Sequence, residues 1–211
     1  DDDGWANSID DLPQEGTQWS DADGDGYGDN AEGSEPDACN SIVGNSTVDR
    51  FGCIDTDGDG RSDADIYWTP EQGADVFSDD SSQWADSDGD TFGDNADGVK
   101  GDNCPNVFGM SETDRSGCPD SDGDYISNPD ADWTVDMGAD ACPDVYGNSS
   151  NDRVGCYDAD GDGWSNPTDD WTIEDGADAY PDDATRWIKE KSSNDGSSSS
   201  SMSSTVIGGG I

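Results

Sequence analysis

Five short acidic loops carry the chemistry that this sequence can perform. The pattern Asp-x-Asp-Gly-Asp begins at Asp21, Asp55, Asp86, Asp120 and Asp158, at successive spacings of 34, 31, 34 and 38 residues. Carboxylates two positions apart in a glycine-containing turn are the donor arrangement of a calcium-binding loop. Composition alone does not produce five such patterns at a nearly regular interval. We therefore expect five metal-binding loops, and a disordered acidic tract is disfavoured.

Calcium loops take oxygen donors from the first, third, fifth, seventh, ninth and twelfth positions, and the seventh donates its backbone carbonyl. Ile66 stands at the twelfth position of the second loop, where Asp65 or a distant carboxylate must substitute. Ala131 stands at the twelfth position of the fourth loop, between Asp130 and Asp132, and Thr91 and Tyr125 replace the sixth-position glycine. The expected ligands are Asp21, Asp23, Asp25, Tyr27, Asp29 and Glu32; Asp55, Asp57, Asp59, Arg61, Asp63 and Asp65; Asp86, Asp88, Asp90, Phe92, Asp94 and Asp97; Asp120, Asp122, Asp124, Ile126, Asn128 and Asp132; and Asp158, Asp160, Asp162, Trp164, Asn166 and Asp169.

The chain opens on part of a sixth loop. Its first residues match the fifth loop from the third position onward, with the leading Asp-x removed. The residues that correspond to Asp160, Asp162, Asn166 and Asp169, and are expected to bind metal, are Asp1, Asp3, Asn7 and Asp10.

The charge of the chain demands a cationic partner. The formal net charge is -44 with only eight Lys and Arg, so the carboxylates repel one another and oppose a compact state. The same sign excludes nucleic acid and anionic membranes as major partners. The chain has no His, which removes the commonest transition-metal ligand and general base. We expect several calcium ions rather than Mg²⁺, and no enzymatic activity.

Six cysteines form three pairs, each separated by 14 positions: Cys39 and Cys53, Cys104 and Cys118, and Cys142 and Cys156. Because Cys-x-x-Cys pairs are absent, disulfides are favoured over zinc thiolates, and the setting is expected to be oxidising and extracellular. Asn45 and Asn148 begin N-glycosylation sequons. No stretch is long enough to span a membrane, and the initial Asp suggests a processed or excised chain.

Three modules account for residues 1–191: the acidic loops, the cysteine hairpins and tryptophan elements such as Trp68-Thr-Pro-Glu-Gln-Gly-Ala-Asp75. Only 29% of the residues are hydrophobic, and Gly, Pro, Asp, Asn and Ser dominate. The expected fold is mostly irregular, with few short strands or turns, and is stabilised by metal and disulfides. A Ser-rich linker at 192–204 and a hydrophobic tail at 205–211, either a docking strand or the start of an anchor, complete the predicted organisation.

The loops and hairpins together resemble thrombospondin type 3 repeats, in the form found in bacterial and archaeal surface proteins. The resemblance covers about residues 1–187 and is carried by units such as Asp102-Asn-Cys104-Pro-Asn-Val-Phe-Gly and Asp140-Ala-Cys142-Pro-Asp-Val-Tyr-Gly. It implies little regular secondary structure, calcium ions strung along the chain, and ligands shared between neighbouring repeats. The residues that would be shared in this way are Asp37, Asp75, Asp102, Asp140 and Asp178.

Three functions remain open at this point. The first, which we favour, is a calcium-rigidified structural protein of the cell surface that assembles into a filament from copies of this chain; the alternative is a calcium-rigidified stalk or spacer of a surface adhesin or glycan-binding protein. In a filament, the 205–211 tail would add to another subunit. The second is an adhesin or glycan-binding module, which would need exposed Trp side chains; we expect the Trp residues to pack between loops instead. The third is an accessory region of a secreted enzyme. Arg50, Arg115 and Arg153 are expected to form local ion pairs.

Overall fold

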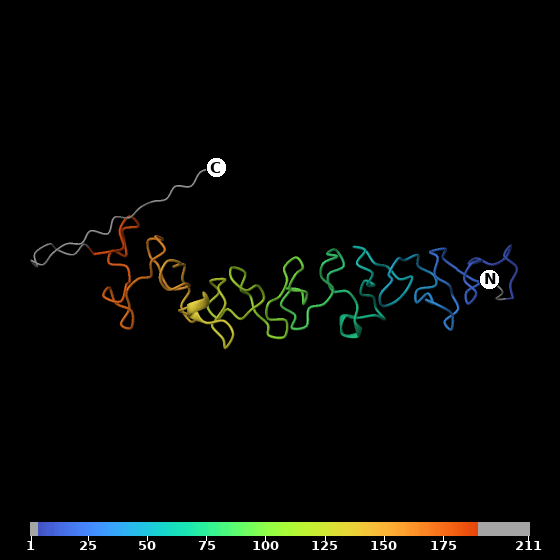
Figure 1. Ribbon diagram of the computed structural model, residues 1–211, viewed down its shortest axis with the longest axis horizontal. Coiled ribbons are helices and arrows are strands. Elements are labelled where there is room, and N and C mark those ends of the chain that lie inside the picture. The colour runs from blue at the N-terminus through green and yellow to red at the C-terminus, as the bar shows by residue number, and fades with distance from the viewer. Residues whose placement is uncertain (1–3, 190–211) are drawn as a thin grey trace, which may run out of the picture.

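The structure, a computed structural model, describes residues 4–189. This part of the chain forms an elongated array in which successive units follow one another along a single axis (Figure 1). By a unit we mean one acidic loop, one cysteine hairpin, or one cysteine-free segment between loops. Its first and last residues lie at opposite ends of the array. The predicted linker at 192–204, the tail at 205–211 and the predicted ligands Asp1 and Asp3 lie outside the described residues.

Regular secondary structure is almost absent from residues 4–189. Two single-turn 3₁₀ helices occur, η1 at Pro70–Gln72 and η2 at Val135–Met137. Within the described residues, strand pairing is limited to three isolated bridges: Gly28 with Pro36, Asp63 with Asp75, and Gly93 with Gly101. Asp, Gly, Ser and Pro favour turns over helices and ladders, so the expected irregular fold is confirmed.

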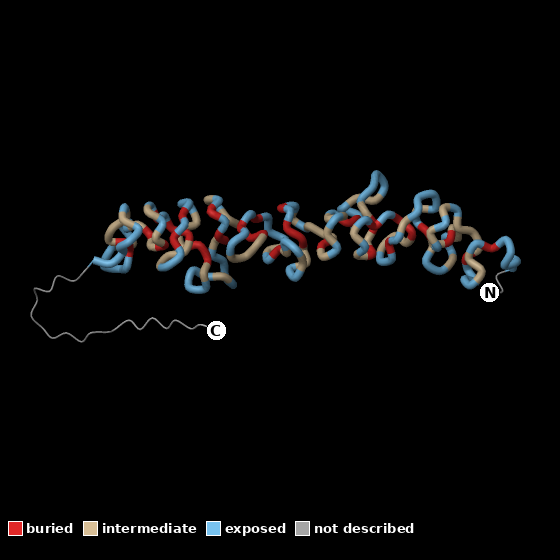
Figure 2. Tube along the Cα trace, turned by 90° about the horizontal axis from the view of Figure 1, so that it is seen from above, coloured by how far each residue is buried: buried red, intermediate tan, exposed pale blue. Residues whose placement is uncertain are grey.

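The interior of the array is polar. Its buried apolar side chains are few, and most are small: Cys53, Ala74, Phe92, Cys118, Ile126, Ala139, Cys156 and Ala177. The buried polar side chains are aspartates, serines and two glutamines. The buried segments recur along the length of the array, and exposed loops project above and below it in this view (Figure 2). Burial of a polar group is unfavourable unless the group is bonded, so the partners of these side chains determine the fold.

Each cysteine pair closes a hairpin, as predicted. Disulfides join Cys39 to Cys53, Cys104 to Cys118 and Cys142 to Cys156, with Cα atoms 5.0 to 5.1 Å apart. A buried serine organises each hairpin from within. The Ser46 hydroxyl donates to the Arg50 carbonyl and accepts the Cys53 N–H. Ser111 and Ser149 make the same two bonds in the other hairpins.

An aspartate, an arginine and a tryptophan connect each hairpin to the unit that follows. In the second hairpin, Asp114 accepts the N–H and hydroxyl of Ser127 at 2.8 and 2.6 Å and the Trp133 indole N–H at 2.9 Å. The Arg115 guanidinium lies 5.6 Å from the centroid of the Trp133 ring and pairs with Asp130 at 2.8 Å. Asp152, Arg153 and Trp171 repeat the arrangement without the ion pair.

The predicted local ion pairs are thus present at two of the three arginines. Arg50 pairs with Asp65 at 2.8 Å and lies over Trp68, matching Arg115 with Asp130 and Trp133. Arg153 instead donates to the Ala141 carbonyl at 3.1 Å. The difference follows from the sequence, because the residue that corresponds to Asp65 and Asp130 is Thr168.

Two cysteine-free connectors, residues 10–19 and 75–84, are held by the amide of a buried glutamine. Gln83 is almost fully buried and donates its amide to the carbonyls of Asn95 and Val99 at 2.8 and 3.1 Å. Gln18 makes equivalent bonds to Asn30 and Ser34. Each amide thereby ties a connector to the loop that follows it.

Candidate metal centres

The structure brings together three carboxylates in each of the five loops. Every triad comes from the first, third and fifth loop positions, and its candidate ligand oxygens all lie within 4.8 Å of one another. The triads are Asp21, Asp23 and Asp25; Asp55, Asp57 and Asp59; Asp86, Asp88 and Asp90; Asp120, Asp122 and Asp124; and Asp158, Asp160 and Asp162. These carboxylates repel one another at such separations, so the arrangement requires specific local bonds.

Backbone N–H groups supply those bonds. The Asp21 carboxylate accepts the N–H of Gly24 at 2.7 Å and of Gly26 at 2.9 Å. Asp25 accepts the N–H of Tyr27 at 2.9 Å. The other four loops repeat the contacts of the first and fifth positions. Each loop is thus a series of Asx turns that points carboxylates toward a common centre.

The sixth loop position has a left-handed backbone in all five loops. Gly26 has φ of 97°, and the non-glycine residues Thr91 and Tyr125 have φ of 78° and 73°. A β-branched residue such as Thr, or a bulky one such as Tyr, rarely adopts this region. The loops at Thr91 and Tyr125 therefore keep the geometry of the glycine loops at the cost of backbone strain.

The ninth-position residues close the loops from outside the triads. The Asp63 carboxylate accepts the N–H and hydroxyl of Thr56, and Asp94 accepts those of Ser87 at 2.9 and 2.6 Å. Asn128 and Asn166 bond to the same loop position, and Asp29 accepts the Ser20 hydroxyl at 2.7 Å. A calcium loop often reaches its ninth position through water, which fits these placements.

The structure does not bring the ligands predicted at or beside the twelfth position into the triads. These side chains are all exposed to solvent: Glu32, Asp65, Asp97, Asp132 and Asp169. Asp65, the proposed substitute in the second loop, is paired with Arg50. For each loop, a different carboxylate is buried close to the triad.

A bridging aspartate lies beyond each loop and is buried against it. We use this term for Asp37, Asp75, Asp102, Asp140 and Asp178, the residues expected to be shared between repeats; their exposed fractions are 6%, 2%, 1%, 0% and 0%. Each Oδ1 accepts the N–H two residues later, at 2.6 to 2.7 Å. Each Oδ2 is buried and has no hydrogen-bond partner. A buried carboxylate oxygen without a donor is unfavourable unless it binds a cation.

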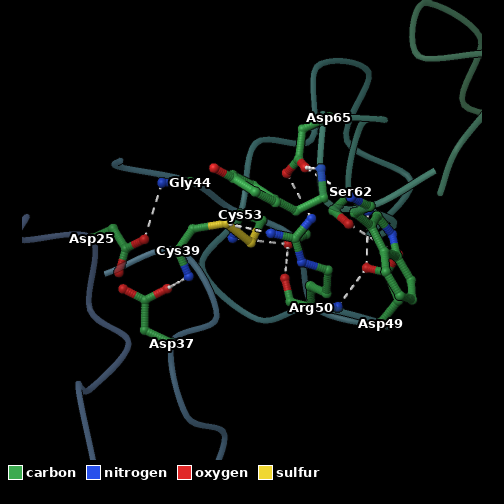
Figure 3. The surroundings of a disulfide bond; sticks show 12 residues. Asp25, Asp37, Cys39, Gly44, Asp49, Arg50, Cys53, Ser62 and Asp65 are labelled. Atoms are coloured by element: carbon green, nitrogen blue, oxygen red, sulfur yellow. Dashed lines mark hydrogen bonds and ion pairs between the residues drawn. A yellow bond between two sulfur atoms is a disulfide. The ribbon is translucent and has the colours of Figure 1, made fainter. Parts of the chain in front are cut away.

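The bridging aspartates face the triads that precede them. Gly52 lies between Asp37 and Asp25, so that a Cβ added to it would meet both carboxylates. Figure 3 shows the Asp25 and Asp37 side chains beside the first disulfide hairpin. Gly155 has the same relation to Asp140 and Asp124. Each centre therefore combines three carboxylates from one loop with a fourth from the following unit.

The electrostatics of the bridging aspartates match this placement. Burial, together with repulsion by the nearby loop carboxylates, raises the pKa of Asp37, Asp75 and Asp102 to about 6 and that of Asp140 to about 7. The pKa of Asp178 is raised for the same reasons. A cation bound among these carboxylates would stabilise their ionised forms and offset the repulsion between them.

Asp10 has the environment of a bridging aspartate. It is 7% exposed, its Oδ1 accepts the Leu12 N–H at 2.8 Å, and its Oδ2 has no partner. The next residue donates its N–H to the carbonyl of Trp19, as the residues after Asp75 and Asp178 donate to Trp84 and Trp187. In the comparison of the first residues with the fifth loop, Asp10 corresponds to Asp169, which is exposed and has a different environment. Asn7 is also exposed.

The seventh-position carbonyls are candidates to supply a further oxygen to each centre, because they have no hydrogen-bond donor among the described residues. Among residues 4–189, no donor is bonded to the backbone oxygens of Tyr27, Arg61, Phe92, Ile126 and Trp164. The third-position aspartates Asp23, Asp57, Asp88, Asp122 and Asp160 likewise retain buried oxygens without a partner. The donor set is made entirely of hard oxygens, which suits a cation such as calcium and offers no nitrogen or sulfur ligand.

Three glycine N–H groups near the centres were not predicted. Gly44 and Gly109 donate to the second oxygens of Asp25 and Asp90, each at 3.0 Å, and Gly147 donates to Asp124 at 3.3 Å. Each glycine stands five residues after the first cysteine of its hairpin. That repeated spacing was the signal that could have identified them.

The three disulfides are typical of an oxidising, extracellular setting. Within residues 4–189, no helix is long and apolar enough to cross a membrane. Asn45 and Asn148, the predicted glycosylation sites, are exposed. No family model matches the chain, and a search of curated proteins also returned no match.

Proposed function

We propose that this chain is an extracellular structural protein whose array is ordered by calcium. The observation that carries the proposal is the repeated centre of three loop carboxylates and one buried bridging carboxylate with an unpartnered oxygen. Four negative charges converge at each centre, and within the described residues the fold offers them only backbone N–H donors. A bound divalent cation offsets this repulsion at every unit of the array.

Calcium is the cation that fits the donors best. The bridging carboxylate, the loop triad and the seventh-position carbonyl supply oxygens from several directions, which suits the flexible shell of six to eight ligands that calcium takes. Magnesium prefers a smaller octahedral shell and retains its waters. The loop and hairpin motifs further support a relation to the thrombospondin type 3 repeats of microbial surface proteins.

Metal binding at shared sites would make the array rigid. Each bridging aspartate belongs to the unit after the loop it faces, so one ion would contact two consecutive units. Hydrogen bonds and ring contacts already join consecutive segments, and a shared ion would add a further restraint on their relative orientation. We therefore propose a stiff, calcium-dependent spacer as the mechanical role of residues 4–189.

Within this role we propose self-assembly into a surface filament, with a tethered stalk as the second candidate. The filament is favoured by the composition of residues 196–211, which carry no charged side chain in a chain of net charge -44. A neutral segment with Val206, Ile207 and Ile211 is the part of the sequence that can approach another copy without repulsion. A stalk would present an adhesive or glycan-binding partner domain instead.

Small-angle scattering and electron microscopy on the purified chain test these proposals, first in millimolar calcium and then in excess chelator. Filaments in calcium that dissociate into expanded monomers in chelator would support the polymer. Rigid monomers in calcium that become expanded in chelator would support the stalk. A radius and maximum dimension that do not change in chelator would contradict the calcium-dependent array itself.

A variant truncated after Lys191 separates the filament from the spacer. We expect this variant to keep its calcium-dependent rigidity and to lose assembly. Equal assembly of the truncated and full chains would contradict the role of the 205–211 tail while leaving calcium binding intact.

A further inference from the structure

The five centres are closed in two different ways. After the first, third and fourth loops, the bridging aspartate leads into a disulfide hairpin: Asp37 precedes Cys39, Asp102 precedes Cys104, and Asp140 precedes Cys142. After the second and fifth loops, Asp75 and Asp178 lead into connectors without cysteine, which end at Trp84 and Trp187. The chemistry of the centre is the same, but its outer wall differs.

In the hairpin-closed centres, two N–H groups of the hairpin bond to the metal-facing carboxylates. For the third loop, the Cys104 N–H donates to Asp102 at 2.6 Å and the Gly109 N–H donates to Asp90 at 3.0 Å. One bond therefore orients the bridging carboxylate and the other orients the fifth-position carboxylate. Both donors belong to the loop that the Cys104–Cys118 disulfide closes.

The connector-closed centres lack the second of these bonds. Asp75 and Asp178 accept the N–H of Phe77 and Tyr180, each at 2.7 Å. However, within the described part of the chain no donor is bonded to Oδ2 of the fifth-position residues Asp59 and Asp162. Among the described residues, no hydrogen bond joins the metal-facing carboxylates of these two centres to a disulfide-closed segment. The preceding hairpins bond instead to other atoms of these loops: Thr47 and Val48 donate to the Gly60 carbonyl, and Ser150 and Asn151 donate to the Gly163 carbonyl.

A glycine packs against each hairpin-closed centre from the other side. Gly52, Gly117 and Gly155, each directly before the second cysteine, have φ of 73°, 74° and 77°. A Cβ on any of them would overlap the carboxylate of Asp37, Asp102 or Asp140 respectively. The backbone at these glycines thus forms a wall of the centre, and the adjoining disulfide holds that wall in place.

We infer that the disulfide hairpins are positioning elements for three of the five metal centres, so that the array contains three redox-sensitive and two redox-insensitive sites. This inference rests on the proposed metal binding and adds its regulation. Reduction would release the hairpin ends, and the N–H donors and the glycine wall would lose their fixed positions relative to the carboxylates. Loss of contacts that orient metal ligands typically lowers affinity by about 10- to 100-fold.

Native mass spectrometry and calorimetric titration with calcium test the inference on the full chain. The oxidised protein is expected to bind ions at five centres of comparable affinity. After reduction and alkylation under non-denaturing conditions, three sites are expected to weaken by about 10- to 100-fold while two keep their affinity. Retention of all five sites, or equal loss of all five, would overturn the inference.

Glycine variants test the same point with every disulfide intact. Gly117→Ala places a methyl group against Asp102, and it is expected to weaken one site only. Gly138→Ala is the matched control, because Gly138 also has a left-handed backbone, with φ of 114°, but its added Cβ would meet only the Trp133 ring, at 3.6 Å. Equal calcium affinities for the two variants would contradict the proposed wall.

The double variant Cys104→Ser with Cys118→Ser completes the design. It removes one hairpin closure and is expected to weaken the third centre alone, leaving four sites at their original affinity. Weakening of the second or fifth centre would show that the disulfides act through general stability. If the oxidised wild-type chain binds no calcium, the proposed function is wrong. If it binds calcium at five sites whose affinities do not change on reduction, the proposed function stands and only the present inference is wrong.

Discussion

The indole rings of Trp164 and Trp187 stack with centroids 6.0 Å apart and planes inclined by only 9°. Trp164 belongs to the fifth loop, where its carbonyl is a candidate ligand, and Trp187 ends the connector that begins at Asp178. The stack therefore joins a loop to the segment that supplies its bridging carboxylate. Trp5 with Trp19, and Arg61 with Trp84, make the corresponding contacts elsewhere.

Removal of this stack is expected to weaken the fifth centre. An aromatic pair contributes about 0.5–1.5 kcal/mol beyond area burial, so Trp187→Ala should lower the calcium affinity of that centre by about 2- to 12-fold. An NMR titration that follows the amide of Gly163 measures this site separately from the others. Trp187→Phe, which keeps a stacking ring, should retain most of the affinity; an equal loss in both variants would contradict the role of the stack.

Neutralising a bridging aspartate should remove most of the affinity of one centre. Asp102→Asn keeps the size of the side chain but replaces the unpartnered Oδ2 by an amide or a neutral oxygen, and we expect about 10- to 100-fold weaker binding at the third loop. Calorimetric titration with calcium measures the loss. Asp97→Asn is the control, since Asp97 occupies the twelfth position but is exposed. Comparable losses of affinity in the two variants would show that the twelfth-position carboxylate contributes to the site as much as the bridging aspartate does.

The raised pKa values of the bridging aspartates predict opposite pH dependences with and without calcium. In chelator, the carboxyl groups of these aspartates stay protonated in the folded array until the pH reaches their pKa of about 6 to 7, whereas the ordinary pKa is 3.8. Their contribution to stability is present below about pH 4 and is lost as the pH rises through 6 to 7, so the array should expand over that range. Scattering in chelator from pH 4 to pH 8 measures the expansion.

With calcium, the sign is reversed because the ion and the proton compete for the same oxygens. Calcium affinity should increase from pH 5 to pH 7.5, and binding near pH 6 should release protons. Titrations in two buffers of different ionisation enthalpy count those protons. Binding without proton release at pH 6 would contradict the assignment of these aspartates as ligands.

The non-glycine residues at the sixth loop position predict a stabilising substitution. Thr91 has φ of 78° in a loop position where the equivalent Gly26 has φ of 97°. Thr91→Gly should relieve strain and raise the free energy of unfolding in calcium by about 0.5–1 kcal/mol. Gly26→Ala is the converse control, because an added Cβ meets no atom within 4 Å and so reports the backbone cost alone. Thermal unfolding in saturating calcium measures both, and destabilisation by Thr91→Gly would contradict the strain.

The acidic triads and the disulfides were predictable because their determinants are local. Carboxylates at alternate positions of a glycine turn converge through Asx bonds within the same few residues. Two cysteines 14 positions apart, in a hairpin with a buried serine, likewise need no distant partner. The same logic explains why the irregular fold was anticipated from the abundance of turn-forming residues.

The fourth carboxylate of each centre could be suspected from family resemblance but could not be derived from loop numbering. Asp10 illustrates the difficulty, because alignment of the loops pairs it with the exposed Asp169. Its role is set instead by the N–H of the next residue, which bonds to Trp19, nine positions after Asp10. The same separation joins Asp75 to Trp84. This nine-residue pairing of an aspartate with a tryptophan belongs to the connector and not to the acidic loop. An alignment of the loops therefore does not reveal it.

The short sequence range of the contacts has a consequence for how the molecule is produced. Among the hydrogen bonds, ion pairs, disulfides and ring contacts that the described residues make with one another, the pair Tyr27 and Phe51 spans the longest stretch of sequence. Each unit is thus completed by the polypeptide that immediately follows it. A chain that emerges in order from its N-terminal side can acquire its final shape progressively, with no segment waiting for a distant partner to be synthesised.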